Sequence, residues 1–202
     1  MQIQKLTMKH YFSEKQEAPF RLKKIAAVLQ RRQFEFFTAP GVFSKSKVDK
    51  GTELLTNSMQ LKENARILDM GCGIGIIGIV AAKVFSADPL LIDINERALS
   101  LAKRNVKLNA VKAEVRKSNL YGSVPEKFDA ILVNPPQKAG KKVCHAIIEQ
   151  APLRLNPGGT LQLVARHNKG GRDMSNRMKE VFGNLQDIAK QSGYRVYLSK
   201  MI

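Results

Sequence analysis

The chain has 202 residues and a mass of 22.5 kDa, and 44% of its residues are hydrophobic and 25% charged. This composition excludes general disorder, and the length suits one domain rather than two. Lys and Arg number 34 against 17 for Asp and Glu, a formal charge of +17, which favours a polyanionic partner such as nucleic acid.

Hydropathy, the N-terminal residues and the cysteine content bear on where in the cell the protein is found. The most apolar stretch, residues 74–84, is too short to cross a bilayer and is interrupted by glycine and lysine. Residues 1–15 lack the apolar core of a secretory signal. The sequence has two cysteines, Cys72 and Cys144, which points away from a disulfide scaffold and fits a reducing compartment. We therefore expect a cytoplasmic protein without a membrane span.

Residues 1–50 carry eleven Lys or Arg and four Asp or Glu. They form either a solvated face or a phosphate-contacting arm, and we predict a basic arm or lip packed on a core of residues 51–202. Aromatic residues are interleaved with these charges and favour core anchors over base-stacking platforms: Tyr11, Phe12, Phe20, Phe34, Phe36 and Phe37. Residues 33–38 alternate weakly and predict an edge strand.

From about residue 60 the chain alternates strands and helices. Apolar runs predict strands at residues 66–70, 90–93, 113–117, 128–134 and 160–165. Helices are predicted at residues 74–85, 96–109, 141–155 and 174–182. Two strands, 185–191 and 194–200, form a hairpin through Ser192-Gly193. Repeated βα units predict an open, mostly parallel sheet with helices on both faces and ligands at the carboxyl ends of the strands.

A glycine-rich turn, residues 71–75, joins the first of these strands to its helix. Glycines allow a sharp turn and let a ligand approach the helix N-terminus. Residues 73–78 also fit G-x-G-x-x-G, and Asp93 lies twenty residues after Gly73, as in a nicotinamide-binding fold. This fingerprint alone does not distinguish between cofactors.

Asp69 ends the strand before this turn. A carboxylate there would repel a pyrophosphate but would suit S-adenosylmethionine, which carries an amino group and a sulfonium and no phosphate. Asp93 ends the next strand and can accept hydrogen bonds from both ribose hydroxyls. The alternative role for Asp69 is to cap the following helix.

Asn134-Pro135-Pro136-Gln137 follows the strand at 128–134. The prolines remove two N–H donors and stiffen a turn that presents the Asn134 amide and the Pro135 carbonyl. Two acceptor oxygens aimed at one –NH2 group would orient its nitrogen lone pair towards a methyl donor, which is catalysis by positioning. The alternative is an ordinary turn after a strand.

Together these motifs resemble class I S-adenosylmethionine-dependent methyltransferases that modify amino groups. More narrowly, they resemble the methyltransferase small domain family, which includes the ribosomal RNA small-subunit methyltransferase C enzymes that make N2-methylguanosine and compact archaeal relatives. The resemblance covers most of the chain and is carried by residues 68–75, Ile92-Asp93, Asn134-Pro135-Pro136 and the segment 41–52. It implies a Rossmann-like sheet of seven strands whose last pair is the antiparallel hairpin.

The resemblance also implies residue roles. Asp69, Gly71 and Gly73, with Cys72 between them, would contact the methionine part of the cofactor. Asp93 would hold the ribose, Ile94 would lie against the adenine, and Asn119 with Leu120 would face the adenine amino group. Asn134 and Pro135, followed by Pro136, would hold the acceptor amine, and Phe43 and Ser44 would close over the cofactor or target base.

Two residues depart from the family pattern. Position 119 usually holds aspartate, and the residue after the prolines is often an aromatic that stacks on the base, whereas this chain has Asn119 and Gln137.

Bacterial relatives carry an extra N-terminal domain, for which the basic arm would substitute. Candidate RNA contacts are Phe43, Ser44, Lys45, Lys47, Gln137 and Arg166. Residues 166–169 either contact RNA phosphate or form a plain surface loop.

The function predicted first is methyl transfer from S-adenosylmethionine to an exocyclic amine of an RNA base, guanine N2 in ribosomal RNA of the 16S type. A protein glutamine amide, as in a release factor, is an alternative acceptor with the same planar –NH2. A nicotinamide-dependent oxidoreductase and a non-catalytic RNA-binding module are further alternatives. Cys144 and His145 are read as structural, Cys72 as packing, and no cluster has metal-ligand spacing.

Overall fold

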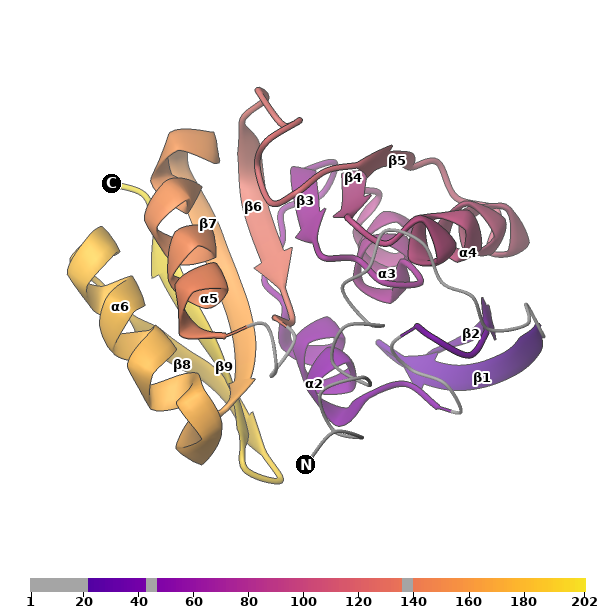
Figure 1. The fold of residues 1–202 in the computed structure, drawn as a ribbon, viewed down its shortest axis with the longest axis horizontal. Coiled ribbons are helices and arrows are strands. Elements are labelled where there is room, and N and C mark those ends of the chain that lie inside the picture. The colour runs from indigo at the N-terminus through magenta and orange to yellow at the C-terminus, as the bar shows by residue number, and fades with distance from the viewer. Residues whose placement is uncertain (1–21, 43–46, 136–139) are drawn as a thin grey trace, which may run out of the picture.

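The computed structural model describes residues 22–42, 47–135 and 140–202. Seven strands form one sheet in the order β5-β4-β3-β6-β7-β9-β8 (Figure 1). They are β3 (Arg66–Met70), β4 (Asp88–Asp93), β5 (Glu114–Lys117), β6 (Phe128–Val133), β7 (Leu155–Arg166), β8 (Gln186–Gln191) and β9 (Tyr194–Lys200). The first five run parallel and β9 runs antiparallel between β7 and β8, so the predicted Rossmann-like sheet and C-terminal hairpin are confirmed.

Helices cover both faces of this sheet. One face packs on α2 (Lys50–Ser58), α3 (Ile76–Phe85) and α4 (Glu96–Leu108), and the other on α5 (Lys141–Gln150) and α6 (Arg172–Phe182). Alternate strand residues divide between the two layers, because successive side chains of a strand point to opposite faces. Ile67 of β3 joins the α2–α3–α4 layer and its neighbour Leu68 joins the α5–α6 layer.

The N-terminal part of the described chain forms a separate hairpin of β1 (Lys23–Leu29) and β2 (Arg32–Thr38). Phe34 and Phe36 are buried in the same hydrophobic cluster as α2 and α3, which confirms them as core anchors. The strand predicted at 33–38 exists, but it pairs within this hairpin and not at the edge of the large sheet. Tyr11, Phe12 and Phe20 lie outside the described residues. The division of the chain at residue 50 stays a prediction.

Some local boundaries differ from the prediction. The helix expected over 141–155 ends at Gln150, followed by a 3-10 turn, Ala151–Arg154, and then β7. Pro152 has no N–H to continue the helical hydrogen bonds, so the helix ends before it. Helix α3 begins at Ile76 rather than residue 74, because Gly75 has φ +88° and still belongs to the turn. Strand β1 and helix α2 were not predicted.

The described residues contain no helix that is both long and apolar enough to cross a membrane. Both cysteines are buried free thiols.

Candidate active site

The carboxyl ends of three adjacent strands meet at one level of the sheet. Met70 of β3 pairs with Ile92 of β4 on one side and with Val133 of β6 on the other. The next residue of each strand is therefore Gly71, Asp93 and Asn134, on strands about 4.8 Å apart. The glycine turn is residues 71–75, and we call residues 134–137, of which the structure describes Asn134 and Pro135, the acceptor turn. The two were predicted from separate motifs, and Gly71 and Asn134 lie next to each other on the same edge of the sheet.

The glycines of the turn serve two purposes. Gly71 and Gly73 have φ of +67° and +55°, and a Cβ at either position would meet no atom of the described residues within 4 Å. The backbone is thus open to an approaching ligand at these two positions. At Gly75 and Gly78, by contrast, a Cβ would lie 2.9 and 2.6 Å from the Leu91 side chain, so these glycines let α3 pack closely on β4.

Asp69 is a fully buried carboxyl beneath the glycine turn. Its Oδ2 accepts a hydrogen bond from the Gly78 N–H at 2.9 Å, so the helix-capping role is confirmed for one oxygen. Its Oδ1 is buried and has no hydrogen-bond partner among the described residues. Burial raises the pKa of Asp69 to about 7, the Gly78 hydrogen bond opposes this rise, and the negative charge of Asp93 adds to it. A buried oxygen without a partner is costly for the fold and fits a ligand that brings a cation or donor.

Asp93 ties the glycine turn to β4. Its Oδ2 accepts from the Gly73 N–H at 2.9 Å and its Oδ1 accepts from the Asn95 N–H at 2.9 Å. Burial raises its pKa, while these backbone hydrogen bonds lower it. Each carboxylate oxygen has a second lone pair, which leaves acceptor capacity for two ribose hydroxyls. Ile94 follows at the same edge and is half-buried.

Asn119 and Leu120 follow β5 and lie beside this acid. Asp93 pairs with Lys117, and the Ser118 N–H donates to the Asp93 carbonyl at 3.1 Å. Asn119 is exposed, and Leu120 is half-buried with φ +49°. Their position fits the predicted adenine contact, which stays a prediction.

Cys72 is packed rather than reactive. The thiol is buried, and burial, followed by the charges of Asp69 and Asp93, raises its pKa well above the usual value. Its N–H donates to the Ile92 carbonyl at 2.8 Å and holds the turn on β4. A thiol that stays protonated is a poor nucleophile.

The Asn134 side chain is held by two residues of the α2 N-terminus. Its Nδ2 donates to Asp49 Oδ2 at 3.1 Å and to Thr52 Oγ1 at 2.9 Å. These hydrogen bonds engage the nitrogen end of the amide and leave the oxygen Oδ1 as its free acceptor end among the described residues. Pro135 is buried. Pro136 and Gln137 lie outside the described residues.

Asp49 and Thr52 were not predicted as site residues. Asp49 caps α2, its Oδ2 accepting from the Gly51 and Thr52 N–H groups at 2.9 and 3.3 Å. The sequence did carry a signal for the helix, since an aspartate N-cap precedes the apolar pair Leu54-Leu55. It carried none for the contact, because Asp49 and Asn134 are 85 positions apart.

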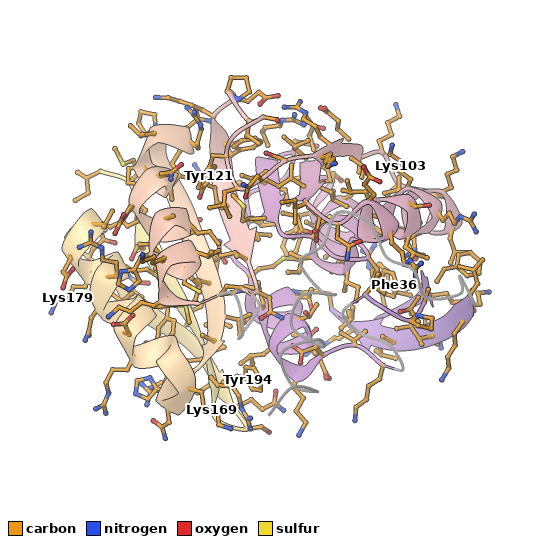
Figure 2. All side chains as sticks on the ribbon, viewed as in Figure 1. Phe36, Lys103, Tyr121, Lys169, Lys179 and Tyr194 are labelled. Carbon is orange, nitrogen blue, oxygen red and sulfur yellow. The ribbon has the colours of Figure 1, made fainter. Side chains whose placement is uncertain are left out.

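Arg166 lies near the acceptor turn. It pairs with Tyr194 across β7 and β9, and its guanidinium carbon is 5.4 Å from the centre of the Tyr194 ring. The Tyr194 ring reaches α2, where its Cε1 would be 3.1 Å from a Cβ at Gly51 (Figure 2). Lys47 is exposed just before α2. Phe43, Ser44 and Lys45, the other predicted RNA contacts of this region, are outside the described residues.

Comparisons with known proteins identify the family. The profile of the methyltransferase small domain family matches residues 33–198. An uncharacterised protein of Bacillus subtilis (strain 168), YbxB, is 35% identical over 198 residues, covering 96% of this chain and 98% of that protein. The ribosomal RNA small subunit methyltransferase C of Haemophilus influenzae (strain PittGG) is 31% identical over 95% of this chain, which spans 59% of that enzyme.

A solved structure of a methyltransferase is also similar to this chain. The 16S rRNA N2 G1207 methyltransferase of Thermus thermophilus, in complex with AdoMet and guanosine, matches with a TM-score of 0.80 and 25% identity over 93% of this chain and 53% of that one. The chain thus spans little more than half the length of the rRNA methyltransferases it resembles. It belongs to the methyltransferase small domain family and is a methyltransferase that uses S-adenosylmethionine.

Proposed function

We propose that this enzyme methylates an exocyclic amino nitrogen of an RNA base, with N2 of guanine in ribosomal RNA as the first candidate. The observation that carries this proposal is the position of Asn134, one strand away from the open glycine turn at Gly71. A donor bound over the turn and an amine bound at Asn134 would be neighbours. Relatives named as rRNA methyltransferases, one of them in complex with guanosine, support the base.

The residues fit S-adenosylmethionine. Asp69 Oδ1 has no hydrogen-bond partner in the part of the chain that the structure describes and suits a cationic ligand, and Asp93 keeps acceptor capacity for the ribose. When bound, this cofactor supplies an electrophilic methyl group on a sulfonium. A nicotinamide cofactor fits less well, because its pyrophosphate would face the buried carboxyl of Asp69, and the family match is to methyltransferases. The same features oppose a non-catalytic binding module, since both halves of the site are present.

The acceptor residues act by position. Asn134 Oδ1 and the Pro135 carbonyl would accept the two protons of a planar –NH2 group and orient its lone pair. The nitrogen can lose a proton to water after attack, so no strong base is needed at the turn. A protein glutamine amide presents the same –NH2 group and remains the alternative acceptor.

Charge favours RNA over a protein acceptor. The formal charge of +17 suits a phosphate backbone. Arg166 lies against Tyr194 beside α2, so a cation is held near the acceptor turn where flanking phosphates would pass. A cytoplasmic location, expected from the cysteine content, completes the proposal.

A transfer assay tests it. The protein is incubated with S-adenosylmethionine labelled on the methyl group and small ribosomal subunits, naked ribosomal RNA or protein extract from cells lacking the gene. We expect label in RNA that nuclease releases as N2-methylguanosine, identified by nucleoside mass spectrometry, with Asn134→Ala as the negative control. Label in glutamine of a protein fraction, with none in RNA, would support the alternative acceptor instead.

A further inference from the structure

The orientation of the Asn134 amide decides what this turn offers to a substrate. Rotated by 180°, the amide would present its –NH2 donor where an acceptor oxygen is needed, and two –NH2 groups would face each other. The oxygen and nitrogen ends of an amide are nearly equal in shape, so packing alone does not select the orientation. Neighbouring hydrogen-bond partners must do so.

Asp49 can select the orientation, and Thr52 can add to its stability. A carboxylate only accepts hydrogen bonds, so Asp49 holds an –NH2 group and repels an amide oxygen. Thr52 Oγ1 accepts from the same Nδ2 at 2.9 Å and adds a hydrogen bond to the orientation that Asp49 selects. Asp49 is itself fixed, because its Oδ2 also caps α2. Gly51 allows the approach, since a Cβ there would lie 3.3 Å from Asn134 Nδ2.

We propose that Asp49 and Thr52 are positioning residues that lock the Asn134 amide with Oδ1 towards the acceptor amine. This inference rests on the proposed role of Asn134 and adds α2 to the catalytic apparatus. The helix does not touch the reacting atoms, and it acts by keeping one of the two amide orientations.

Thr52 offers the cleaner test, since Asp49 also caps the helix. Among the described residues, the Thr52 hydroxyl has one hydrogen bond, which it accepts from Asn134. The side chain is buried, so Thr52→Val keeps the shape and removes this acceptor. Thr52→Ser keeps the acceptor. Thr56 provides a matched control one turn later: it is also buried, and its hydroxyl donates to the Thr52 and Glu53 carbonyls without reaching Asn134.

The first measurement is steady-state methyl transfer at saturating S-adenosylmethionine. We expect kcat to fall about 3- to 10-fold for Thr52→Val, which corresponds to loss of one hydrogen bond. Thr52→Ser should restore most of the rate, and Thr56→Val should leave it unchanged. The dissociation constant of S-adenosylhomocysteine should be the same in all variants, because Thr52 is assigned to the acceptor half of the site.

A second measurement does not depend on turnover. The side-chain –NH2 signals of Asn134 in a ¹⁵N NMR spectrum, identified by their loss in Asn134→Ala, should shift in Thr52→Val and stay in place in Thr56→Val. Equal kcat in the two valine variants, unmoved Asn134 signals, or a weakened cofactor affinity with unchanged kcat would overturn the inference. If Asn134→Ala itself kept full activity, the proposed acceptor role would fall, and this inference with it.

Discussion

Asp69 is a buried carboxyl whose environment is unfavourable in the free protein and would become favourable when a cationic ligand binds. It is fully buried, its pKa is raised to about 7, and its Oδ1 has no partner among the described residues. Below about pH 7 the carboxyl is protonated and cannot attract a cation. A bound cation favours the ionised form, so binding at or below this pH would release a proton.

This predicts that S-adenosylhomocysteine binds more tightly as the pH rises from 6 to 7.5. Calorimetry across this range measures the dissociation constant, and repeating it in buffers of different ionisation enthalpy measures the released proton. Asp69→Asn should bind more weakly and lose this pH dependence. A wild-type affinity independent of pH, or a variant with the same slope, would contradict the role of Asp69.

The same carboxyl should destabilise the ligand-free protein at high pH. A carboxyl whose pKa is higher in the folded than in the unfolded chain stabilises the fold at low pH, and this contribution is lost as the pH rises through about 7. Asp69→Asn keeps an acceptor for the Gly78 N–H and removes the buried charge. Thermal unfolding should therefore show a higher Tm for the variant at pH 8, with a smaller gain at pH 6. A variant less stable by the same amount at both values would exclude this explanation.

Asp93 should matter for cofactor affinity before it matters for rate. Its two oxygens accept from the Gly73 and Asn95 N–H groups, so its loss would free the glycine turn and remove the acceptors proposed for the ribose. We expect Asp93→Ala to weaken S-adenosylhomocysteine binding about 10- to 100-fold, measured by calorimetry. An unchanged dissociation constant would place the ribose elsewhere.

At the level of elements, the glycines that follow β3 have two different roles: Gly78 allows close packing, and Gly71 leaves the backbone open to a ligand. A methyl group at Gly78 would lie 2.6 Å from Leu91 Cδ1, whereas one at Gly71 would meet none of the described atoms within 4 Å. Gly78→Ala should therefore lower the free energy of unfolding by about 1–3 kcal/mol through overpacking. Gly71→Ala, at φ +67°, should lose about 1–2 kcal/mol from backbone strain alone. Urea unfolding measures both.

A second substitution should relieve the overpacking at Gly78. Leu91→Ala combined with Gly78→Ala removes the clash, so the double variant should lose less than the sum of the single variants. Additive losses would show that Gly78 is not limited by Leu91.

The elements that sequence predicted well are those whose signals are local. Apolar runs and glycine turns define β3, β4 and β6, and these strands place the candidate site. Strand β1 has exposed charges and one short alternation, and α2 is only nine residues long, so neither has a strong periodic signal. The end of α5 was placed five residues late because the apolar spacing continues through Leu155, although Pro152 already breaks the hydrogen bonds.

For the candidate site, too, the residues with local signals were predicted and the long-range contacts were not. Asp69 and Asp93 lie at the carboxyl ends of β3 and β4, and Asn134 directly follows β6. The register of a parallel sheet brings strand ends together. The Asp49 and Thr52 contacts to Asn134 arise from how α2 docks on the sheet, which no local pattern encodes.

At the scale of the whole molecule, cations outnumber anions two to one. Some are neutralised locally, as Arg177 is by Glu149 and Glu180. The excess predicts RNA binding whose logarithm of affinity falls linearly with the logarithm of salt concentration. Arg166→Ala should weaken RNA binding, lower this slope by about one phosphate contact and leave S-adenosylhomocysteine affinity unchanged. Filter binding or fluorescence anisotropy over a salt series measures the slope, and an affinity insensitive to salt would contradict an RNA partner.

The most direct test of the account is turnover by Asn134→Ala at saturating S-adenosylmethionine, with S-adenosylhomocysteine affinity measured on the same preparation. Asn134, the residue proposed to orient the acceptor amine, lies one strand away from the glycine turn, without forming part of it. We therefore predict a loss of kcat of about 100-fold or more with a nearly unchanged dissociation constant. Full turnover by this variant, or a loss explained by failed cofactor binding, would contradict it.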